Sequence, residues 1–307
     1  MKNKVIAGLI IVFFVTFSWG CNNNSLNTIE TNEPVIETTI SPTLQITTIP
    51  PTITPTQEPA AAIVNEESIL LSDFEEEYLR YKDAYTSSDV DLDETVARAT
   101  VLENMLDVLL LAQGSRKIGF QISDEIYQQR VDNLVSQLGS VEQLNDWMEK
   151  NHYSAESFKR LYKLEIEAAH MRDSILESVP KSAEQIRARQ IMVQSKTMAE
   201  QIYSQLQSGA DFATLAWIYD PITGGELSWF PANYLVLKEV EDAVFILNTG
   251  EYTPIIATDY GYQIVQVIEK VDDRTLTQDA LFSYQRSALS KWIQENKQNS
   301  SIFILIN

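Results

Sequence analysis

A segment near the N-terminus has a composition that cannot form a folded core, and it separates the first residues from the rest of the chain. Residues 22–60 contain no lysine or arginine, and six of the ten prolines lie there among repeated threonines. Such a composition buries no core and favours extended, polyproline-like backbone. At about 3.1 Å per residue the segment reaches on the order of 100 Å when fully extended. We therefore expect residues 21–60 to be a disordered linker, with O-glycosylation of its threonines as an alternative to a plain spacer.

The residues before the linker have the three parts of a signal peptide. Two lysines precede an apolar run, residues 5–17, and small residues lead to Cys21, the only cysteine of the chain. An apolar run this short does not span a bilayer comfortably, since about 20 residues are needed. The pattern resembles a bacterial lipoprotein signal, with residues 1–20 removed and Cys21 lipid-modified, although Ser18 stands where such signals usually carry leucine. An uncleaved anchor or an ordinary secretory signal is the alternative.

Composition and charge exclude several classes of protein. At 307 residues with 44% hydrophobic content, the chain is long enough for two domains of about 150 residues with ordinary cores. A formal charge of −20 argues against a nucleic-acid partner, whose phosphates need clustered cations, and against an anionic lipid surface held by charge alone. One cysteine allows no internal disulfide and no Cys-based metal site. We expect no cofactor and no metal.

Apolar periodicity predicts a helical region over residues 61–181. Residues 61–65 are typical of a short strand, and apolar residues then recur at steps of three and four. Helices are expected to begin at Ser72, Ser123, Ser140 and Ser154, with these four serines as N-caps, and another helix carries the apolar stripe of residues 102–113. Pro180 is expected to end the region. Each apolar stripe fits core packing better than a cofactor site.

Residues 182–273 mix strands and helices, and residues 274–307 return to a helix and one strand. Strands are expected at 187–193, 252–256 and 262–269, and helices at 197–206, 212–219, 240–247 and 277–298. The last strand, residues 301–306, is too apolar for a free tail. We predict that it pairs with residues 61–65. The fold class is then α+β, with a discontinuous helical domain into which the mixed domain is inserted.

Five sequence blocks of the mixed region follow one another in a familiar order. They are residues 209–216 (GADFATLA), 224–230 (GGELSWF), 241–247 (EDAVFIL), 250–251 (GE) and 261–264 (GYQI). This order resembles the PpiC-type parvulin family of peptidyl-prolyl isomerases (rotamases). The flanking sequence, with Ile63-Val64-Asn65 at its start and Trp292 near its end, resembles the chaperone domain of the SurA and PrsA families of exported foldases. The resemblance implies a SurA-like helical domain and a parvulin domain, whose four-stranded antiparallel sheet is surrounded by helices.

In parvulins two facing histidines on the central strands form a hydrogen-bonded pair beneath the substrate. The resemblance puts one directly after Arg189 and the other directly after Tyr262, and here both positions hold glutamine, Gln190 and Gln263. A glutamine carries a donor and an acceptor on one amide, so a Gln–Gln pair can preserve a hydrogen-bonded floor. It cannot titrate near neutral pH as imidazole does. The sequence leaves two alternatives: the glutamine pair supports catalysis, or the domain keeps its peptide groove without catalysis.

The resemblance assigns further residues to the same site. Asp220 corresponds to an acidic or thiol residue beside the reacting amide, and a surface turn residue is the equal alternative. The residues expected to bind the substrate are Leu227, Phe230, Val236, Val240, Thr258 and Tyr260. Val236 and Val240 replace the usual Met and Phe, which implies a wider and shallower proline slot. Tyr260 as a plain strand-end aromatic is the alternative to a groove residue.

Two functions are compatible with this resemblance. The first is an exported peptidyl-prolyl cis-trans isomerase that assists protein folding. The second is a holdase chaperone whose parvulin domain has lost activity. In both, the partners are unfolded or proline-containing exported polypeptides. The protein is expected on the extracytoplasmic face of a bacterial cell envelope, attached to the membrane through lipid on Cys21. A structural envelope lipoprotein without clients would leave the chaperone-like helices and the groove unexplained.

Overall fold

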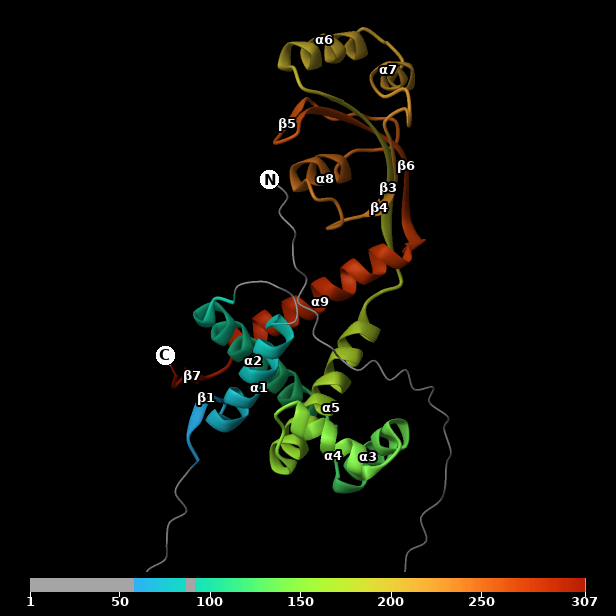
Figure 1. Cartoon of the computed structure of the whole chain (residues 1–307). Coiled ribbons are helices and arrows are strands. Elements are labelled where there is room, and N and C mark those ends of the chain that lie inside the picture. The colour runs from blue at the N-terminus through green and yellow to red at the C-terminus, as the bar shows by residue number, and fades with distance from the viewer. Residues whose placement is uncertain (1–57, 87–91, 307) are drawn as a thin grey trace, which may run out of the picture. The chain divides into compact units, whose positions relative to one another are not determined.

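A computed structural model of the chain describes residues 58–86 and 92–306 (Figure 1). The predicted leader, Cys21 and nearly all of the predicted linker lie outside these described residues. Within the two described ranges, no helix is both long enough and apolar enough to cross a membrane.

The two ends of the described chain meet in a small antiparallel sheet. Strand β1 (Ala60–Val64) lies between β2 (Glu67–Leu70) and β7 (Ile302–Ile304), and Figure 1 shows β7 near β1. Val64 pairs with Ile302. The predicted pairing of the two terminal segments is therefore confirmed, and the helical domain is discontinuous in sequence.

Asn65 joins the parts of this sheet at the turn that follows β1. Its backbone has a left-handed φ of 50°, which asparagine adopts more readily than most residues. Its amide nitrogen donates to Gln113 Oε1 at 2.8 Å and to Ser300 Oγ at 3.0 Å, and its Oδ1 accepts from the Ser301 N–H at 3.0 Å. Gln113 in turn donates to the Val64 carbonyl. One side chain thus connects the start of the domain, its end and its central helix.

The helical domain confirms three of the four predicted N-caps and most of the predicted packing; the cap predicted at Ser72 is wrong, because the first helix already begins at Leu71. Its helices are α1 (Leu71–Thr86), α2 (Glu94–Lys117), α3 (Asp124–Leu138), α4 (Val141–Lys150), α5 (Ala155–Ser178) and, after the inserted domain, α9 (Gln278–Gln298). Ser123, Ser140 and Ser154 each accept a backbone N–H of the first turn. Leu106 and Leu109 of α2 are buried in the main core cluster. The expectation for α3 is wrong, because none of its residues is fully buried and its apolar stripe is half-exposed.

The inserted domain is built on a four-stranded antiparallel sheet, as predicted. The strands are β3 (Ser182–Val193), β4 (Glu226–Pro231), β5 (Ile256–Thr258) and β6 (Gly261–Thr275), in the order β4-β3-β6-β5. Three strands differ from the expected bounds. β3 begins earlier, at Ser182, and β6 continues to Thr275. β5 begins at Ile256, where the expected strand ends, and Tyr252 forms only an isolated bridge with Gln266. The central pair, β3 and β6, runs from Ser182 opposite Thr275 to Val193 opposite Tyr262.

Helices cover both faces of this sheet. They are α6 (Lys196–Gln207), α7 (Phe212–Tyr219) and α8 (Lys238–Phe245). α6 and α7 pack on the face that presents Ile191 and Ile264. α8 packs on the other face, against Ala188, Val265 and Val267. The two faces alternate along each strand, as the period of two requires.

Replacing Asn65 with alanine tests the closure of the helical domain. The change removes three side-chain hydrogen bonds and places alanine in a left-handed conformation, so we expect a loss of about 3 kcal/mol in the free energy of unfolding. Urea denaturation of the purified chain measures it. The matched control is Asn145→Ala on α4, whose side chain is exposed and which should cost less than about 0.5 kcal/mol. Equal effects of the two changes would contradict the role of Asn65.

Candidate functional site

The register of β3 and β6 puts Gln190 and Gln263 on one face of the sheet. Gln190 lies opposite Val265, and Met192 lies opposite Gln263. Residues two apart on a strand share a face, and residues directly opposite each other on paired strands share it too. All four side chains therefore lie on the face that α8 covers. Gln190 and Gln263 belong to neighbouring residue pairs on that face.

The two glutamine amides have different environments. Gln263 is 3% exposed, and its Nε2 donates to Thr258 Oγ1 at 3.5 Å and to Met192 Sδ at 3.7 Å. The Gln190 side chain is partly exposed and has no hydrogen-bond partner among the described residues. Within that part of the chain no hydrogen bond joins the two glutamines. The bonded Gln–Gln floor considered from the sequence is replaced by a bond from Gln263 to Thr258.

Met192 is a residue of this site that the sequence analysis missed. It is 45% exposed and lies opposite Gln263 on the central strand pair. Its thioether is apolar and adaptable, which suits a surface that accepts varied side chains. The alternation of β3 contains the signal, because Met192 follows Gln190 by two residues.

Asp220 organises a turn close to Gln190. Its Oδ1 accepts from the N–H groups of Ile222 at 3.0 Å and Thr223 at 3.1 Å. Its Oδ2 accepts from the Thr223 hydroxyl and the Gly225 N–H. These bonds, above all the one from the Thr223 hydroxyl, lower the pKa of Asp220 to about 2. The carboxylate is therefore charged at neutral pH and occupied by the turn, which agrees with the alternative of a turn residue.

Gly225 fastens this turn to β3. The Gly225 carbonyl accepts the backbone N–H of Gln190 at 2.8 Å. Its φ is +69°, and a Cβ at this position would lie 1.9 Å from the Gln190 carbonyl oxygen. Only glycine allows this approach. The turn therefore sets the backbone position of Gln190.

The residues expected to bind proline differ widely in exposure. Phe230 and Val240 are each 2% exposed and belong to the core cluster between the sheet and α8. Both side chains are therefore core residues and do not form an exposed binding surface. The exposed members are Val236 at 92% and Tyr260 at 61%, while Leu227 and Thr258 are half-buried.

Glu241 is a second residue that the sequence analysis missed as part of the site. It lies in the first turn of α8 and is 3% exposed. Its Oε1 accepts the N–H of Asn233 at 2.6 Å, and its Oε2 accepts those of Tyr234 at 2.8 Å and Leu235 at 2.9 Å. A buried carboxylate needs such compensation. Glu241 thereby fixes loop 231–237, which carries Val236. The signal in the sequence is an acidic residue between two buried valines of one helix.

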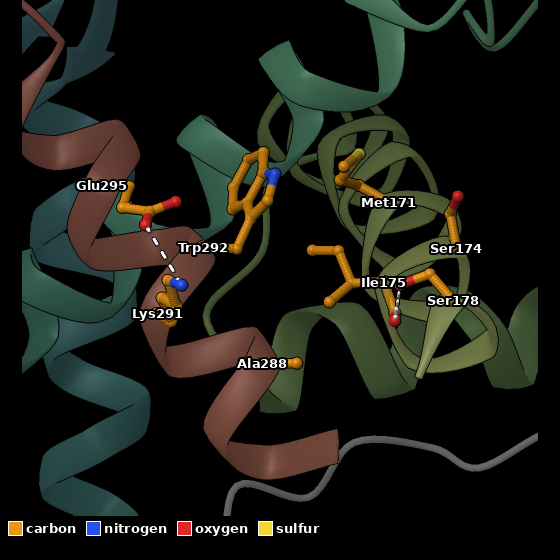
Figure 2. A pocket seen from close by; sticks show the side chains of 8 residues that line it. All are labelled: Met171, Ser174, Ile175, Ser178, Ala288, Lys291, Trp292 and Glu295. Carbon is orange, nitrogen blue, oxygen red and sulfur yellow. Dashed lines mark hydrogen bonds and ion pairs between the residues drawn. The ribbon is translucent and has the colours of Figure 1, made fainter. Parts of the chain in front are cut away.

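A groove of about 380 Å³ lies in the helical domain, between α5 and α9. It is lined by Met171, Ser174, Ile175, Ser178, Ala288, Lys291, Trp292 and Glu295. Figure 2 shows Trp292 on α9 across from Met171 and Ile175 on α5. Lys291 and Glu295 are 3.8 Å apart, one turn along α9. Gly114 of α2 makes room for the indole, because a Cβ there would lie 2.6 Å from the Trp292 ring.

Replacing Gly225 with alanine tests whether the turn sets Gln190. We expect a loss of about 3 kcal/mol or more in the free energy of unfolding, from the left-handed φ and from the clash with the Gln190 carbonyl. Gly209→Ala is the matched control, since Gly209 also has a positive φ but nothing within 4 Å of its Cβ position, and should lose about 1 kcal/mol. Guanidinium denaturation compares them. Similar losses in the two variants would mean that the close approach of Gly225 to Gln190 makes no contribution to the free energy of unfolding.

Comparisons with known proteins agree with this architecture. Residues 176–271 match the family described as PPIC-type PPIASE domain, and residues 2–162 match the SurA-like N-terminal domain. The foldase protein PrsA of Caldanaerobacter subterraneus subsp. tengcongensis is 30% identical over 225 residues, which are 67% of this chain and 72% of that protein. The chaperone SurA of Nitrosococcus oceani is 25% identical over 250 residues, covering 68% and 57%.

A further relative matches over a shorter stretch, and a solved structure matches over a longer one. The foldase protein PrsA of Geobacillus sp. (strain WCH70) is 42% identical over 94 residues, which are 29% of this chain and 34% of that protein. A crystal structure of the peptidylprolyl isomerase PrsA from Bacillus cereus has a TM-score of 0.44 at 23% identity, covering 77% of this chain and 87% of that one. Taken with the two family matches, the 30% identity across most of the Caldanaerobacter protein means that this chain belongs to the PrsA and SurA family of foldases, with a SurA-like N-terminal domain and a PPIC-type peptidyl-prolyl isomerase domain.

Proposed function

We propose that this protein is a foldase of the bacterial cell envelope that binds exported polypeptides and isomerises their X–Pro bonds on the extracytoplasmic face of a membrane. Lipid on Cys21 anchors it, and the linker of residues 21–60 joins the anchor to the folded part. Relatives named foldase PrsA and chaperone SurA support the general role. The lipid anchor is supported by the order of charges, apolar run and cysteine in the leader.

The proposed isomerase activity needs no reactive group in the site, because no covalent bond is made or broken. Rotation about an X–Pro amide passes a barrier of about 18–20 kcal/mol without breaking a bond. It is promoted by an apolar slot, by removal of water and by hydrogen-bonding groups that favour the twisted amide. No nucleophile, metal or titrating base has to take part. A pair of glutamines is therefore compatible with such catalysis.

The observation that carries the proposal is the shared face of Gln190 and Gln263. The register of β3 and β6 puts both on the α8 side of the sheet, above a core that includes Phe230 and Val240. The Gln190 amide, which has no partner among the described residues, is available to bond a carbonyl of a bound peptide. Gln263 is held by Thr258 and serves the geometry of the floor.

A second function, a holdase without isomerase activity, is favoured by a different observation. The described histidines, His152 and His170, lie in the helical domain, hydrogen-bonded to Asp83 and Ser115. None stands at the parvulin positions. The groove between α5 and α9 offers apolar surface for an unfolded segment independently of the parvulin sheet. Both functions share the clients and differ only in catalysis.

Isomerisation of a proline-containing tetrapeptide by the purified full chain decides between them. We expect measurable activity in the native chain, a loss of about tenfold or more in Gln190→Ala, and a gain in the variant with both Gln190→His and Gln263→His. Gln201→His, an exposed change on α6, is the control and should leave activity unchanged. If only the double-histidine variant is active, the isomerase proposal fails and the holdase stands.

Replacing Cys21 with serine tests the anchor. The change removes the thiol that would carry the lipid, so we expect the protein to move from the membrane fraction to the soluble fraction of the producing bacterium. Immunoblots of the two fractions measure it, with the native chain processed in parallel. A Cys21→Ser variant that still sediments with membranes would identify the apolar run, residues 5–17, as the anchor.

A further inference from the structure

Loop 231–237 of the parvulin domain is held from two sides. From within the domain, the Glu241 carboxylate accepts the N–H groups of Asn233, Tyr234 and Leu235. From outside it, the Tyr284 hydroxyl of α9 donates to the carbonyl of Ala232, at the start of the same loop, at 2.7 Å. A loop of this length with a left-handed residue, Asn233 at φ 58°, depends on such bonds for a single conformation.

Tyr284 is suited to act as a permanent donor to this loop. Burial, followed by the negative charge of Glu241, raises the pKa of Tyr284 above its ordinary value. The hydroxyl therefore keeps its proton throughout the physiological range of pH. Since a backbone carbonyl can only accept, the direction of the bond to Ala232 is defined.

The turn of α9 that carries Tyr284 is fastened to the helical domain. The next residue, Gln285, donates from Nε2 to the carbonyl of Leu176 on α5 at 3.3 Å. Further along the helix, Leu289 and Trp292 pack against a cluster that includes Met171 and Ile175 of α5 and Leu111 of α2. Tyr284, Ala288 and Trp292 follow one another at steps of four, so one stripe of α9 touches the parvulin loop and lines the helical groove.

We propose that Tyr284 is a positioning residue for peptide binding: its bond to Ala232 makes the conformation of loop 231–237, and with it the proline slot at Val236, depend on the helical domain. This inference rests on the proposed function, because the slot has to bind peptide. It assigns no catalytic contact to Tyr284. The side chain acts through the loop, whose last exposed apolar residue is Val236, at 92% exposure.

Tyr284→Phe removes only the hydroxyl and tests the proposal in the full chain. We expect hydrogen exchange at the amides of Asn233, Tyr234 and Leu235 to become about tenfold faster, the effect of one ordinary hydrogen bond. KM for the proline tetrapeptide should rise about fivefold while kcat stays within twofold, because the change weakens binding and leaves the glutamines in place. The matched control is Tyr127→Phe on α3, whose hydroxyl has no hydrogen bond within the described residues and which should change neither quantity.

Each outcome bears on the proposal separately. Unchanged exchange at the three loop amides would overturn it whatever the kinetics show. Faster exchange with an unchanged KM would overturn the coupling to peptide binding. If the native chain neither binds nor isomerises the tetrapeptide, the proposed function fails, and the proposal that Tyr284 positions a peptide site fails with it. The exchange comparison would then still show whether Tyr284 holds the loop.

Discussion

The antiparallel pairing of β3 and β6 is the interaction on which both domains depend. Its first pair, Ser182 and Thr275, brings the beginning and the end of the inserted domain next to each other. The chain therefore leaves the helical domain after α5 and returns to it at α9 from nearly the same place. The same ladder carries Gln190 and Gln263 on pairs that are neighbours on one face of the sheet. Because a one-residue slip would turn every side chain to the opposite face, the register that closes the insertion also determines that Gln190 and Gln263 lie on the face covered by α8.

The helical domain depends on a second long-range closure, in which residues near both ends of the described chain pair. Such a closure costs chain entropy before its contacts form, and the contacts are concentrated at Asn65. Asn65 has a left-handed backbone, and its three side-chain hydrogen bonds help to offset that entropy cost. α9 lies between the two closures in sequence. It carries Tyr284 toward the parvulin loop and ends before β7, which explains how one helix can serve both domains.

Local signals in the sequence predicted much of this fold, and non-local bonds were what they missed. The three serine N-caps depend on residues within one turn and were correct, as was the pairing of two strongly apolar termini. β4 is a short strand whose partner, β3, lies far away in the chain, so no local pattern distinguishes it from a turn. β2 pairs with β1 across the turn at Asn65 and Glu66, which is a local hairpin that the sequence analysis missed. Glu241 looked like an ordinary first-turn acid because its partners, three loop amides, become visible only when the loop folds back. The contact of Gln263 with Met192 was also non-local, since the two residues lie on strands far apart in the chain, whereas Thr258 belongs to the same β5–β6 hairpin as Gln263.

The exchange of histidine for glutamine has different consequences at the two positions. Gln263 is buried, so its amide must be satisfied, and Thr258 and Met192 supply its partners. That side chain is a structural part of the floor. The Gln190 side chain is partly exposed and has no hydrogen-bond partner within the described residues, so the proposed function assigns it to a bound peptide. In an enzyme that moves protons the loss of imidazole would be decisive, but amide rotation needs only a shaped, water-poor slot with placed donors. Under the proposed function, activity then depends less on the chemistry of these two side chains than on how firmly loop 231–237 and the turn at Gly225 are held.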